Sequence, residues 1–534
     1  MDSKSDTINE LLNIKEASKF ASEYLGKNVT TANIIYLINY GRISKLGDDN
    51  SILISKKELI QYYNSFKGSR EFNWKAKLGT DLNWALSFEN LKEAETTKHV
   101  HRLHPYKGKF IPQLVEYFLD SHTDNFKQNI YFHKGDIILD PFCGSGTTLV
   151  QANELGINAI GVDISAFNTL ISNTKISPYD EDILIQEIHR ITNLLEAFSK
   201  RNNTLDFEKE LTAELNEFNN KWFPVPDFKR KVQLKEINGE KYGQEKEKIF
   251  LPIYKKLVQK YNIKLLQPTA NCFIEKWYTE HIREEIDFVF NEIKKIKNTS
   301  VKNILCIVLS RTMRSCRATT HADLATLKDP IIYTYYCAKH GKICKPIFSI
   351  LKWWKTYSKD TVNRLHEFSL IRTNSYQLCI TGDSRSINIP DVIKTYNMPF
   401  YELICKNKIK GIFSSPPYVG LINYHEQHAY AYDLFGFTRN DEQEIGPLYK
   451  GQGNTAKESY VNGISAVLNN AKQFLADDFD IFLVANDKYG LYPSIAEKSG
   501  LQIVNQYKRP VLNRTEKDKG AYSEIIFHLK DKTF

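Results

Sequence analysis

Hydrophobic side chains near the start of the chain recur at helical spacing. Apolar positions come every three or four residues in "IKEASKFASEYLG", residues 14–26, and again in "TTANIIYLINYGRI", residues 30–43. This period predicts two short helices. Gly26 suits the end of the first helix, and Thr30 or Thr31 is a suitable cap for the start of the second.

A short strand and a third helix are expected next. "SILIS", residues 51–55, is typical of a brief strand, and Ser55 with Glu58 forms the pattern of a capping box that opens a helix over residues 56–66. Residues 1–68 resemble the small winged helix-turn-helix of excisionase and MerR-type proteins, whose second helix sits in the major groove of DNA. The resemblance implies a DNA-binding domain. A generic helical bundle or a protein-docking module stays open as the alternative.

Farther along, the pattern changes to alternating strands and helices. "DIILD" (136–140) and "NAIGVDIS" (158–165) are β-rich segments on either side of a helical stretch, which predicts a parallel α/β sheet. Later strands are expected at residues 377–384, 410–415, 480–487, 501–509 and 523–530. No helix-length gap separates the last two, which favours an antiparallel pair at a sheet edge.

A long, highly charged segment divides these strands into two groups. It has few strand signals and reads as a helical insertion that interrupts the sheet domain. The expected units are a helix-turn-helix at 1–68, the first part of the sheet domain at 69–180, the insertion at 181–375, and the second part at 376–534.

Composition narrows the class of protein. The chain has 534 residues, a formal charge of +9 and eight scattered cysteines. No apolar run approaches the ~18 residues that span a bilayer, and the first ten residues carry no secretion signal. We therefore expect a cytoplasmic protein with reduced thiols and no membrane partner. The basic excess favours a polyanionic partner.

A glycine-rich loop follows the first strand expected of the sheet. "DPFCGSGTT", residues 140–148, lies between a strand and a helix, where open α/β sheets bind nucleotide-like ligands. Gly144 and Gly146 allow a tight turn and a close approach of the backbone to the ligand. Asp163 ends the next strand, where a carboxylate can accept hydrogen bonds from ribose hydroxyls. The loop has neither the G-x-G-x-x-G of dehydrogenases nor the G-K-[ST] of P-loop kinases.

Four short motifs share their order with those of a known enzyme family. "DPFCGSGTT", "GVDIS", "TGDSRS" and "SSPPY" resemble motifs I to IV of the S-adenosylmethionine-dependent amino-methyltransferases of DNA, and "HPYKGKFIPQLVEYFL" resembles their motif X. The resemblance covers residues 99–180 and 376–534 and implies a Rossmann-like class I methyltransferase sheet with S-adenosylmethionine as its cofactor. The cofactor-binding residues that it implies are Lys109, Phe110, Asp140, Phe142, Gly144, Gly146, Thr147, Asp163 and Asp383. The insertion lies between motifs II and III, earlier than in the best-known arrangement.

The resemblance also assigns the catalytic chemistry to "SSPPY". It implies that the Ser415 hydroxyl and the carbonyl of Pro416 accept the amine hydrogens of a base flipped out of the duplex. Pro416 and Pro417 would hold these acceptors rigidly, and the ring of Tyr418 would stack on the extruded base. Because Ser at the first position is typical of cytosine N4 enzymes, the expected product is N4-methylcytosine.

Other activities stay open from the sequence. Asp or Asn in place of Ser415 is typical of adenine N6 enzymes, and RNA guanine N2 methyltransferases share a similar loop and a Pro-Pro-Tyr. A non-catalytic DNA-binding regulator is a third alternative. Cytosine C5 chemistry is disfavoured, because the Pro-Cys dipeptide that it requires occurs nowhere in the chain. Double-stranded DNA is the expected partner, and a restriction-modification system with a cognate endonuclease is the expected setting.

Two groups of side chains outside the motifs are candidate DNA contacts. Arg311, Arg314 and Arg317 recur every three residues in the insertion, which predicts one stripe of a helix that contacts phosphates. His425 and His428 follow "SSPPY" and are expected on one helix face, in the wall of the substrate pocket next to the DNA.

A short segment rich in cysteine and histidine completes the candidates. "CAKHGKIC" holds Cys337, His340 and Cys344, and Cys316 or His321 offers a fourth metal donor. The spacing is irregular for a zinc finger or ribbon, and thiols in a mixed core are the commoner explanation. No metal ligand is therefore assigned from the sequence.

Overall fold

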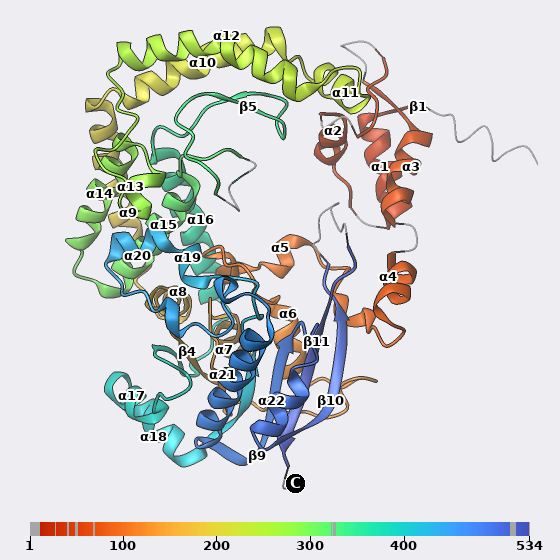
Figure 1. Ribbon diagram of the computed structural model, residues 1–534, viewed down its shortest axis with the longest axis vertical. Coiled ribbons are helices and arrows are strands. Elements are labelled where there is room, and N and C mark those ends of the chain that lie inside the picture. Colours follow the sequence, from red (N-terminus) through yellow and green to blue (C-terminus); the bar gives the residue numbers. More distant parts are fainter. Residues whose placement is uncertain are drawn as a thin grey trace, which may run out of the picture.

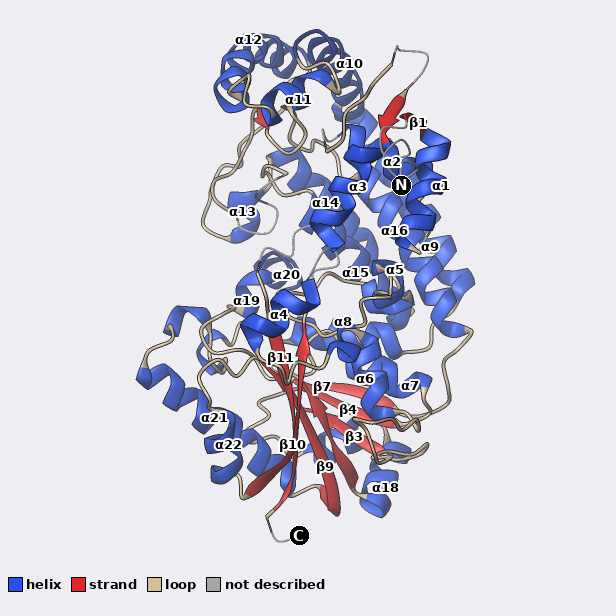
Figure 2. Ribbon diagram, turned by 90° about the vertical axis from the view of Figure 1, so that its right-hand side faces the viewer, coloured by secondary structure: helices blue, strands red, loops and turns tan. Residues whose placement is uncertain are grey.

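A twisted sheet of seven strands forms the centre of the fold. The computed structural model describes residues 11–26, 28–39, 42–47, 52–67, 70–321, 323, 327–512 and 520–532. The strands of the sheet are β3 (Ile137–Asp140), β4 (Asn158–Asp163), β7 (Gln377–Thr381), β8 (Ile409–Ser414), β9 (Leu475–Ala485), β10 (Leu501–Pro510) and β11 (Ser523–Asp531). Their order is β10-β11-β9-β8-β3-β4-β7 (Figure 2). β11 runs antiparallel to both of its neighbours and β10 lies at the edge, which confirms the expected antiparallel pair.

Helices cover both faces of this sheet. Side chains alternate along β3, so Ile138 joins one hydrophobic cluster while Ile137 and Leu139 join the other. The first cluster includes residues of α6 (Pro112–Leu119), α7 (Thr147–Glu154) and α8 (Ala166–Ile176). The second includes residues of α17 (Ile389–Tyr396), α18 (Met398–Asn407), α21 (Asn454–Lys472) and α22 (Tyr492–Lys498). The result is a three-layer α/β fold with the loops at the strand ends exposed to ligands.

The segment 181–375 adds helices and one small hairpin. Its elements are α9 (Glu181–Arg201), α10 (Thr204–Trp222), α11 (Asp227–Gln233), α12 (Gly239–Lys260), α13 (Phe273–Trp277), α14 (Glu280–Lys294), α15 (Thr299–Ser315), β5 (Tyr335–Cys337), β6 (Lys342–Cys344) and α16 (Leu351–Ser369). None of its described residues joins the seven-stranded sheet, as the sequence predicts for an insertion.

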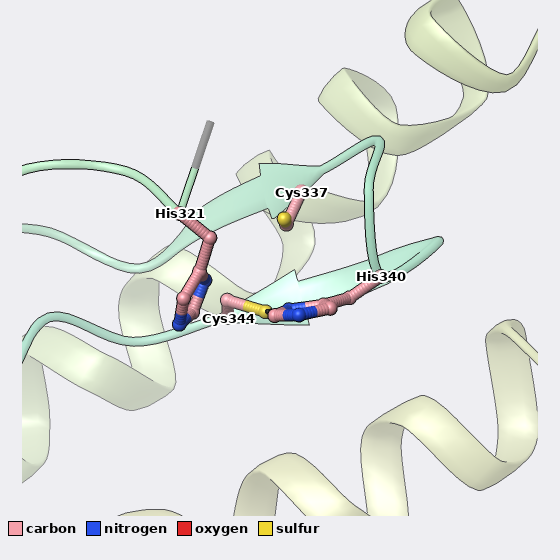
Figure 3. A group of neighbouring side chains, drawn as sticks. All are labelled: His321, Cys337, His340 and Cys344. Atoms are coloured by element: carbon pink, nitrogen blue, oxygen red, sulfur yellow. Dashed lines mark hydrogen bonds between the residues drawn. The ribbon is translucent and has the colours of Figure 1, made fainter. Parts of the chain in front are cut away.

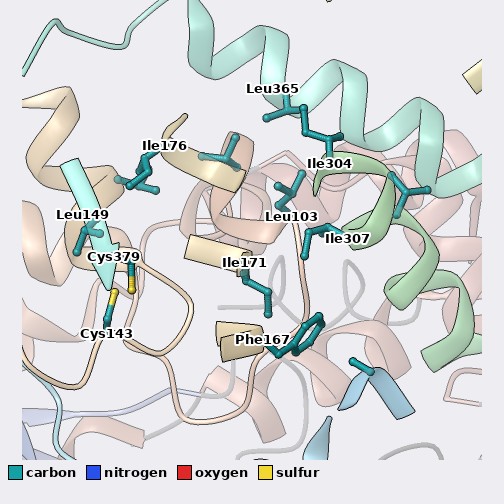
Figure 4. Packing of buried hydrophobic residues seen from close by; sticks show 14 of the residues in the cluster. Leu103, Cys143, Leu149, Phe167, Ile171, Ile176, Ile304, Ile307, Leu365 and Cys379 are labelled. Atoms are coloured by element: carbon teal, nitrogen blue, oxygen red, sulfur yellow. The ribbon is translucent and has the colours of Figure 1, made fainter. Parts of the chain in front are cut away.

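Part of this insertion is nevertheless built into the core of the sheet domain. Ile304 and Ile307 of α15 and Leu365 of α16 belong to the same buried cluster as Leu103 and Phe167 (Figure 4). Residues of α9, α13 and α14 join it as well. The sequence reads this segment as an insertion and not as part of the sheet domain, and that interpretation is wrong for α9 and α13–α16.

The remaining elements of the insertion form what we call the outer lobe, namely α10–α12 and the β5–β6 hairpin. It has a hydrophobic core of its own, which includes Phe207, Phe250, Tyr254, Ile343 and Phe348. Figure 1 shows α10 and α12 at the end of the molecule opposite the sheet. The outer lobe is thus the part of the insertion that stands apart.

The N-terminal unit contains the elements predicted for it. They are α1 (Ile14–Leu25), α2 (Thr31–Asn39), β2 (Leu53–Ser55) and α3 (Lys56–Lys67), and β1 (Leu11–Asn13), which was not predicted, pairs antiparallel with β2. Gly26 ends α1 in the left-handed conformation with φ of 62°, as expected. Ser55 accepts the backbone N–H of Glu58, but the Glu58 carboxylate accepts from Ser44 instead of completing a capping box.

A connector links this unit to the sheet domain. It contains α4 (Arg70–Leu78) and α5 (Glu93–Thr96), and the backbone N–H of Asn83 donates to the carbonyl of Lys508 on edge strand β10 at 2.7 Å. This contact covers part of an edge that would otherwise be open to another strand. Among the described residues, every helix is too short or too polar to cross a bilayer.

Candidate active site

A pocket lies at the carboxyl ends of β3, β4, β7 and β8, the edge at which open α/β sheets bind ligands. Asp140, Asp163, Asp383 and Ser415 stand at or just after these four strand ends, and all four line the pocket. Of the predicted cofactor-binding residues, Lys109, Phe110, Phe142, Gly144 and Thr147 line it too, and Gly146 does not. Residues far apart in sequence are thus brought together as predicted.

The glycine loop turns sharply between β3 and α7. Gly144 and Gly146 have φ of 52° and 75°, in the left-handed region that favours glycine. A Cβ on Gly144 would come within 3.1 Å of the Tyr106 ring, and a Cβ on Gly146 within 2.9 Å of Ser172. Gly146 therefore serves the packing of the loop, whereas Gly144 faces the pocket.

Two carboxylates hold this loop in place. Asp163 accepts the backbone N–H of Gly144 at 2.7 Å and that of Ser165 at 2.8 Å. Asp140 accepts the hydroxyl of Ser414 at 2.5 Å. Burial raises the pKa of both carboxyl groups to about 6. The ends of β3, β4 and β8 are therefore tied to one another around the loop.

Residues of the "HPYKGKF" segment and of the β7 end form the two sides of the pocket. The Lys109 ammonium donates to the carbonyl of His101 at 2.7 Å, and burial lowers its pKa to about 8. The Phe110 ring packs edge-on against Phe413 of β8, with centroids 5.5 Å apart. Asp383 is ion-paired with Arg385 at 2.6 Å.

The Ser-Pro-Pro-Tyr segment begins where β8 ends. Ser415 and Pro417 line the pocket, and Pro416 is buried. Tyr418 does not line it; its hydroxyl donates to Glu524 of β11 at 2.8 Å. The segment thus presents a serine to the pocket from a rigid backbone.

Sequence reasoning missed several residues of the pocket wall, among them Tyr106, Tyr424 and Glu444. The rings of Tyr106 and Tyr424 stack with centroids 6.2 Å apart, and both line the pocket. Glu444, also in the lining, accepts the backbone N–H of His425 at 2.8 Å. Tyr106 lies in the stretch that resembles motif X, and Tyr424 directly precedes the candidate His425, so a signal was available for both. Glu444 lies in a loop without a motif.

The two histidines after this segment are buried. His425, 1 % exposed, contacts the Glu444 carboxylate through Nδ1 and lines the pocket as expected. His428, 3 % exposed, packs among the rings of His104, Tyr106 and Phe167. α19 (Tyr424–Gln427) ends before α20 (Ala429–Phe435) begins, so the two do not share a helix face. The predicted shared face is wrong, and burial contradicts direct DNA contact by His428.

The predicted arginine stripe does not form. Arg311 is 5 % exposed and is ion-paired with Asp360 at 2.6 Å, and Arg317 lies beyond the end of α15, where its Nε donates to the carbonyl of Arg314. Arg311 therefore joins α15 to α16 inside the protein and does not face DNA. Burial, with the added charge of Arg314, lowers the pKa of His428 to about 3.

Comparisons with known proteins agree with this geometry. The DNA methylase family N6_N4_Mtase matches residues 15–173. The Type II methyltransferase M.MjaII of Methanocaldococcus jannaschii is 47 % identical over 529 residues, which cover 98 % of this chain and 97 % of that protein. M.MvaI of Kocuria varians is 31 % identical over 150 residues, 28 % of each chain, and M.BsoBI of Geobacillus stearothermophilus is 42 % identical over 72 residues, 14 % of this chain and 13 % of that one. Because the match to M.MjaII runs the length of both proteins, the chain belongs to the Type II DNA methyltransferases.

Proposed function

We propose that this enzyme transfers a methyl group from S-adenosylmethionine to the exocyclic N4 of cytosine in double-stranded DNA. The observation that carries the proposal is Ser415, at the head of Ser-Pro-Pro-Tyr, on the wall of the same pocket as the glycine loop. A Type II relative of the same length supports a role as the modification enzyme of a restriction-modification system, with a cognate endonuclease as partner.

The pocket suits S-adenosylmethionine. At Gly144 a Cβ would press on Tyr106, so only bare backbone leaves room at this turn. Asp163 would accept hydrogen bonds from the ribose hydroxyls, and Asp383 offers a second carboxylate across the pocket. Lys109 and Phe110 would lie at the methionine end. When bound, the cofactor supplies an electrophilic methyl group on a sulfonium.

The target base would be held by the segment that follows β8. The Ser415 hydroxyl and the Pro416 carbonyl accept the hydrogens of the exocyclic amine, which leaves the nitrogen lone pair available as the nucleophile. No covalent bond between enzyme and base is needed. Tyr418 would stack on the extruded base, and its hydrogen bond to Glu524 fixes the ring before the base arrives.

DNA contacts are proposed at three places. Arg314 and Lys107 lie close enough that Arg314 helps to lower the pKa of Lys107, after the larger effect of burial, and both would contact phosphates beside the flipped nucleotide. The outer lobe would read the target sequence, because it is the part of the insertion with a core of its own. Residues 1–68 would add backbone contacts as a helix-turn-helix.

Identification of the methylated nucleoside tests the proposal. Plasmid DNA is incubated with the enzyme and isotopically labelled S-adenosylmethionine, then digested to nucleosides and analysed by mass spectrometry. N4-methylcytosine is expected. N6-methyladenine would keep the mechanism and overturn the choice of base, whereas 5-methylcytosine would contradict the mechanism. Label in a transfer RNA control instead of DNA would favour the RNA alternative.

A further inference from the structure

Four potential metal ligands converge at the β5–β6 hairpin of the outer lobe. Cys337 ends β5, Cys344 ends β6, His340 lies in the turn between them, and His321 comes from the segment before β5 (Figure 3). One ligand atom from each of these residues lies within 4.8 Å of the others. Both cysteines are buried, and neither forms a disulfide.

The hairpin geometry explains why three of these side chains meet. β5 and β6 are antiparallel strands of three residues each. The backbone N–H groups of His340 and Gly341 donate to the carbonyl of Cys337 at 3.0 and 2.7 Å, which folds the turn back over the strands. As a result, His340 Nδ1 lies 3.4 Å from Cys344 Sγ.

His321 is oriented by a contact outside the cluster. Its Nδ1 lies 2.9 Å from the hydroxyl of Tyr335, and its ring centroid is 4.4 Å from that of His340. A hydrogen bond at one ring nitrogen fixes the tautomer and the direction of the other, as is usual for metal-binding histidines. Cys316, the other fourth donor that the sequence allowed, is buried in the core of the sheet domain and lies outside this cluster.

We propose that Cys337, Cys344, His321 and His340 bind one Zn²⁺ ion. Two thiolates and two imidazoles are a donor set that zinc prefers, and four protein ligands in a tetrahedron are typical of structural sites. Bonds of about 2.3 Å to sulfur and about 2.0 Å to nitrogen place such ligand atoms roughly 3.3 to 3.8 Å apart. The limit of 4.8 Å on the observed separations is about 1 Å above that range, so the side chains would close in by up to about that distance on binding the ion.

The surrounding segment has little regular structure, although Ile343 and Phe348 anchor its later part in the core of the outer lobe. Between α15 and α16 the described residues form regular structure only in the two short strands. The hydrophobic cluster at the hairpin consists of Tyr335, Cys337 and Cys344, with Ile331 packed against them. Long connections without secondary structure are uncommon in compact domains, and a metal clip reduces the entropy lost when they are ordered. Zinc would therefore hold this hairpin in the outer lobe.

Two other groups of potential ligands are weaker candidates. In His99, His101 and Glu154, the carboxylate is already ion-paired with Lys98 at 2.5 Å. In His425, Asp441 and Glu444, Asp441 is ion-paired with Arg439 at 2.6 Å, and Glu444 accepts backbone N–H groups. Each group offers three ligands and no thiol, so neither matches a structural zinc site.

Metal analysis of the untagged full-length chain tests the site. After expression with zinc chloride and exhaustive dialysis, plasma mass spectrometry is expected to find about one zinc ion per chain. The double variant Cys337→Ser/Cys344→Ser is expected to retain less than about a tenth of that amount. Cys405→Ser, which changes an exposed cysteine, and Cys316→Ala, which changes the excluded donor, should keep the ion.

A second measurement needs no variant. Cobalt(II) added to the metal-free wild-type chain should give thiolate charge-transfer bands and the intense visible bands of tetrahedral coordination, and zinc should displace it. Removal of zinc by a chelator should lower the melting temperature by several degrees. A wild-type chain that takes up neither metal would overturn the proposal, as would a double variant with the zinc content of the wild type.

Discussion

The sheet domain and the outer lobe are held together in different ways. The pocket residues stand on strand ends, and both faces of those strands are buried in extended hydrophobic clusters. The outer lobe instead depends on a small core of mostly aromatic side chains and on the β5–β6 hairpin. Pocket geometry should therefore survive damage to the outer lobe, whereas target recognition should not. The following experiments test that separation.

Gly144→Val should have the largest effect, a loss of measurable cofactor binding. The substitution adds strain at φ of 52° and pushes a side chain toward the Tyr106 ring, 3.1 Å from the new Cβ. Gly436→Val is the matched control, because Gly436 has φ of 70° and no atom within 4 Å of an added Cβ. Calorimetry should show the loss only in the first variant. Unchanged affinity in folded Gly144→Val would mean that the loop does not hold the cofactor.

Phe348→Ala should destabilise the outer lobe by about 3 to 5 kcal/mol, because it opens a cavity between Phe207 and His281. Hydrogen exchange should become faster in α10 and α12, and DNA affinity should fall while cofactor affinity is retained. Phe126→Ala, at a position 46 % exposed, provides the control. A parallel fall in cofactor affinity would show that the two regions are not separate.

Ser415→Ala should reduce kcat by about 100-fold with little change in KM for DNA, because the lost acceptor acts mainly in the transition state. Steady-state kinetics on a substrate duplex measures both constants. Ser494→Ala, at an exposed serine outside the pocket, should behave as the wild type. If the KM for DNA increased while kcat stayed unchanged, Ser415 would contribute to DNA binding and not to the methyl transfer step.

Cofactor affinity should fall as the pH drops below about 6, by up to tenfold per pH unit, because burial raises the pKa of Asp163 to about 6 and protonation removes an acceptor. The pKa of Asp163 is higher in the folded protein than in the unfolded chain. Ionised Asp163 therefore lowers the free energy of unfolding above pH 6, and protonation removes that penalty as the pH falls from 6 toward 4. Protonation of Asp163 thus does not unfold the protein, and unfolding by this route cannot explain the lower cofactor affinity. Asp163→Asn should bind weakly with a shallower profile, in which the remaining slope comes from Asp140, whose pKa burial also raises to about 6. A slope equal to that of the wild type would exclude Asp163 as the cause.

Deletion of residues 1–68 should have the smallest effect, a several-fold loss of DNA affinity and a flatter dependence on salt, since fewer counterions are released. The N-terminal unit has its own hydrophobic core, so its removal should leave the rest folded. Binding assays over a salt series, with specific and random duplexes, measure both quantities. Complete loss of sequence preference would transfer recognition to the N-terminal unit.

Local signals in the sequence were enough to predict the sheet and the pocket residues at its strand ends. The glycine loop and Ser-Pro-Pro-Tyr each follow a strand, and strand ends of a parallel sheet meet at one edge. Contacts between distant segments were not predictable in this way. The spacing of three residues between the arginines does not reveal that Arg311 pairs with Asp360. It also does not reveal that α15 ends at Ser315, before Arg317.

The same limit applies to the insertion and to the proposed zinc ligands. An amphipathic, charged helix has the same pattern whether it packs on its own lobe or on the sheet, so α9 and α13–α16 could not be assigned to the sheet domain from sequence. The choice between Cys316 and His321 depends on how a loop returns to the hairpin, which residue spacing does not encode.

The packing of Ile304, Ile307 and Leu365 against Leu103 and Phe167 limits how specificity can be exchanged between relatives. A chimaera that replaces all of residues 181–375 would pack insertion residues from one protein against sheet-domain residues from another within a single hydrophobic cluster. Replacement of residues 204–263 together with 321–348 would instead exchange the core of the outer lobe and keep all four proposed zinc ligands together. With the proposed role of the outer lobe in reading the target, the transferable unit of recognition would be smaller than the inserted segment and split in sequence.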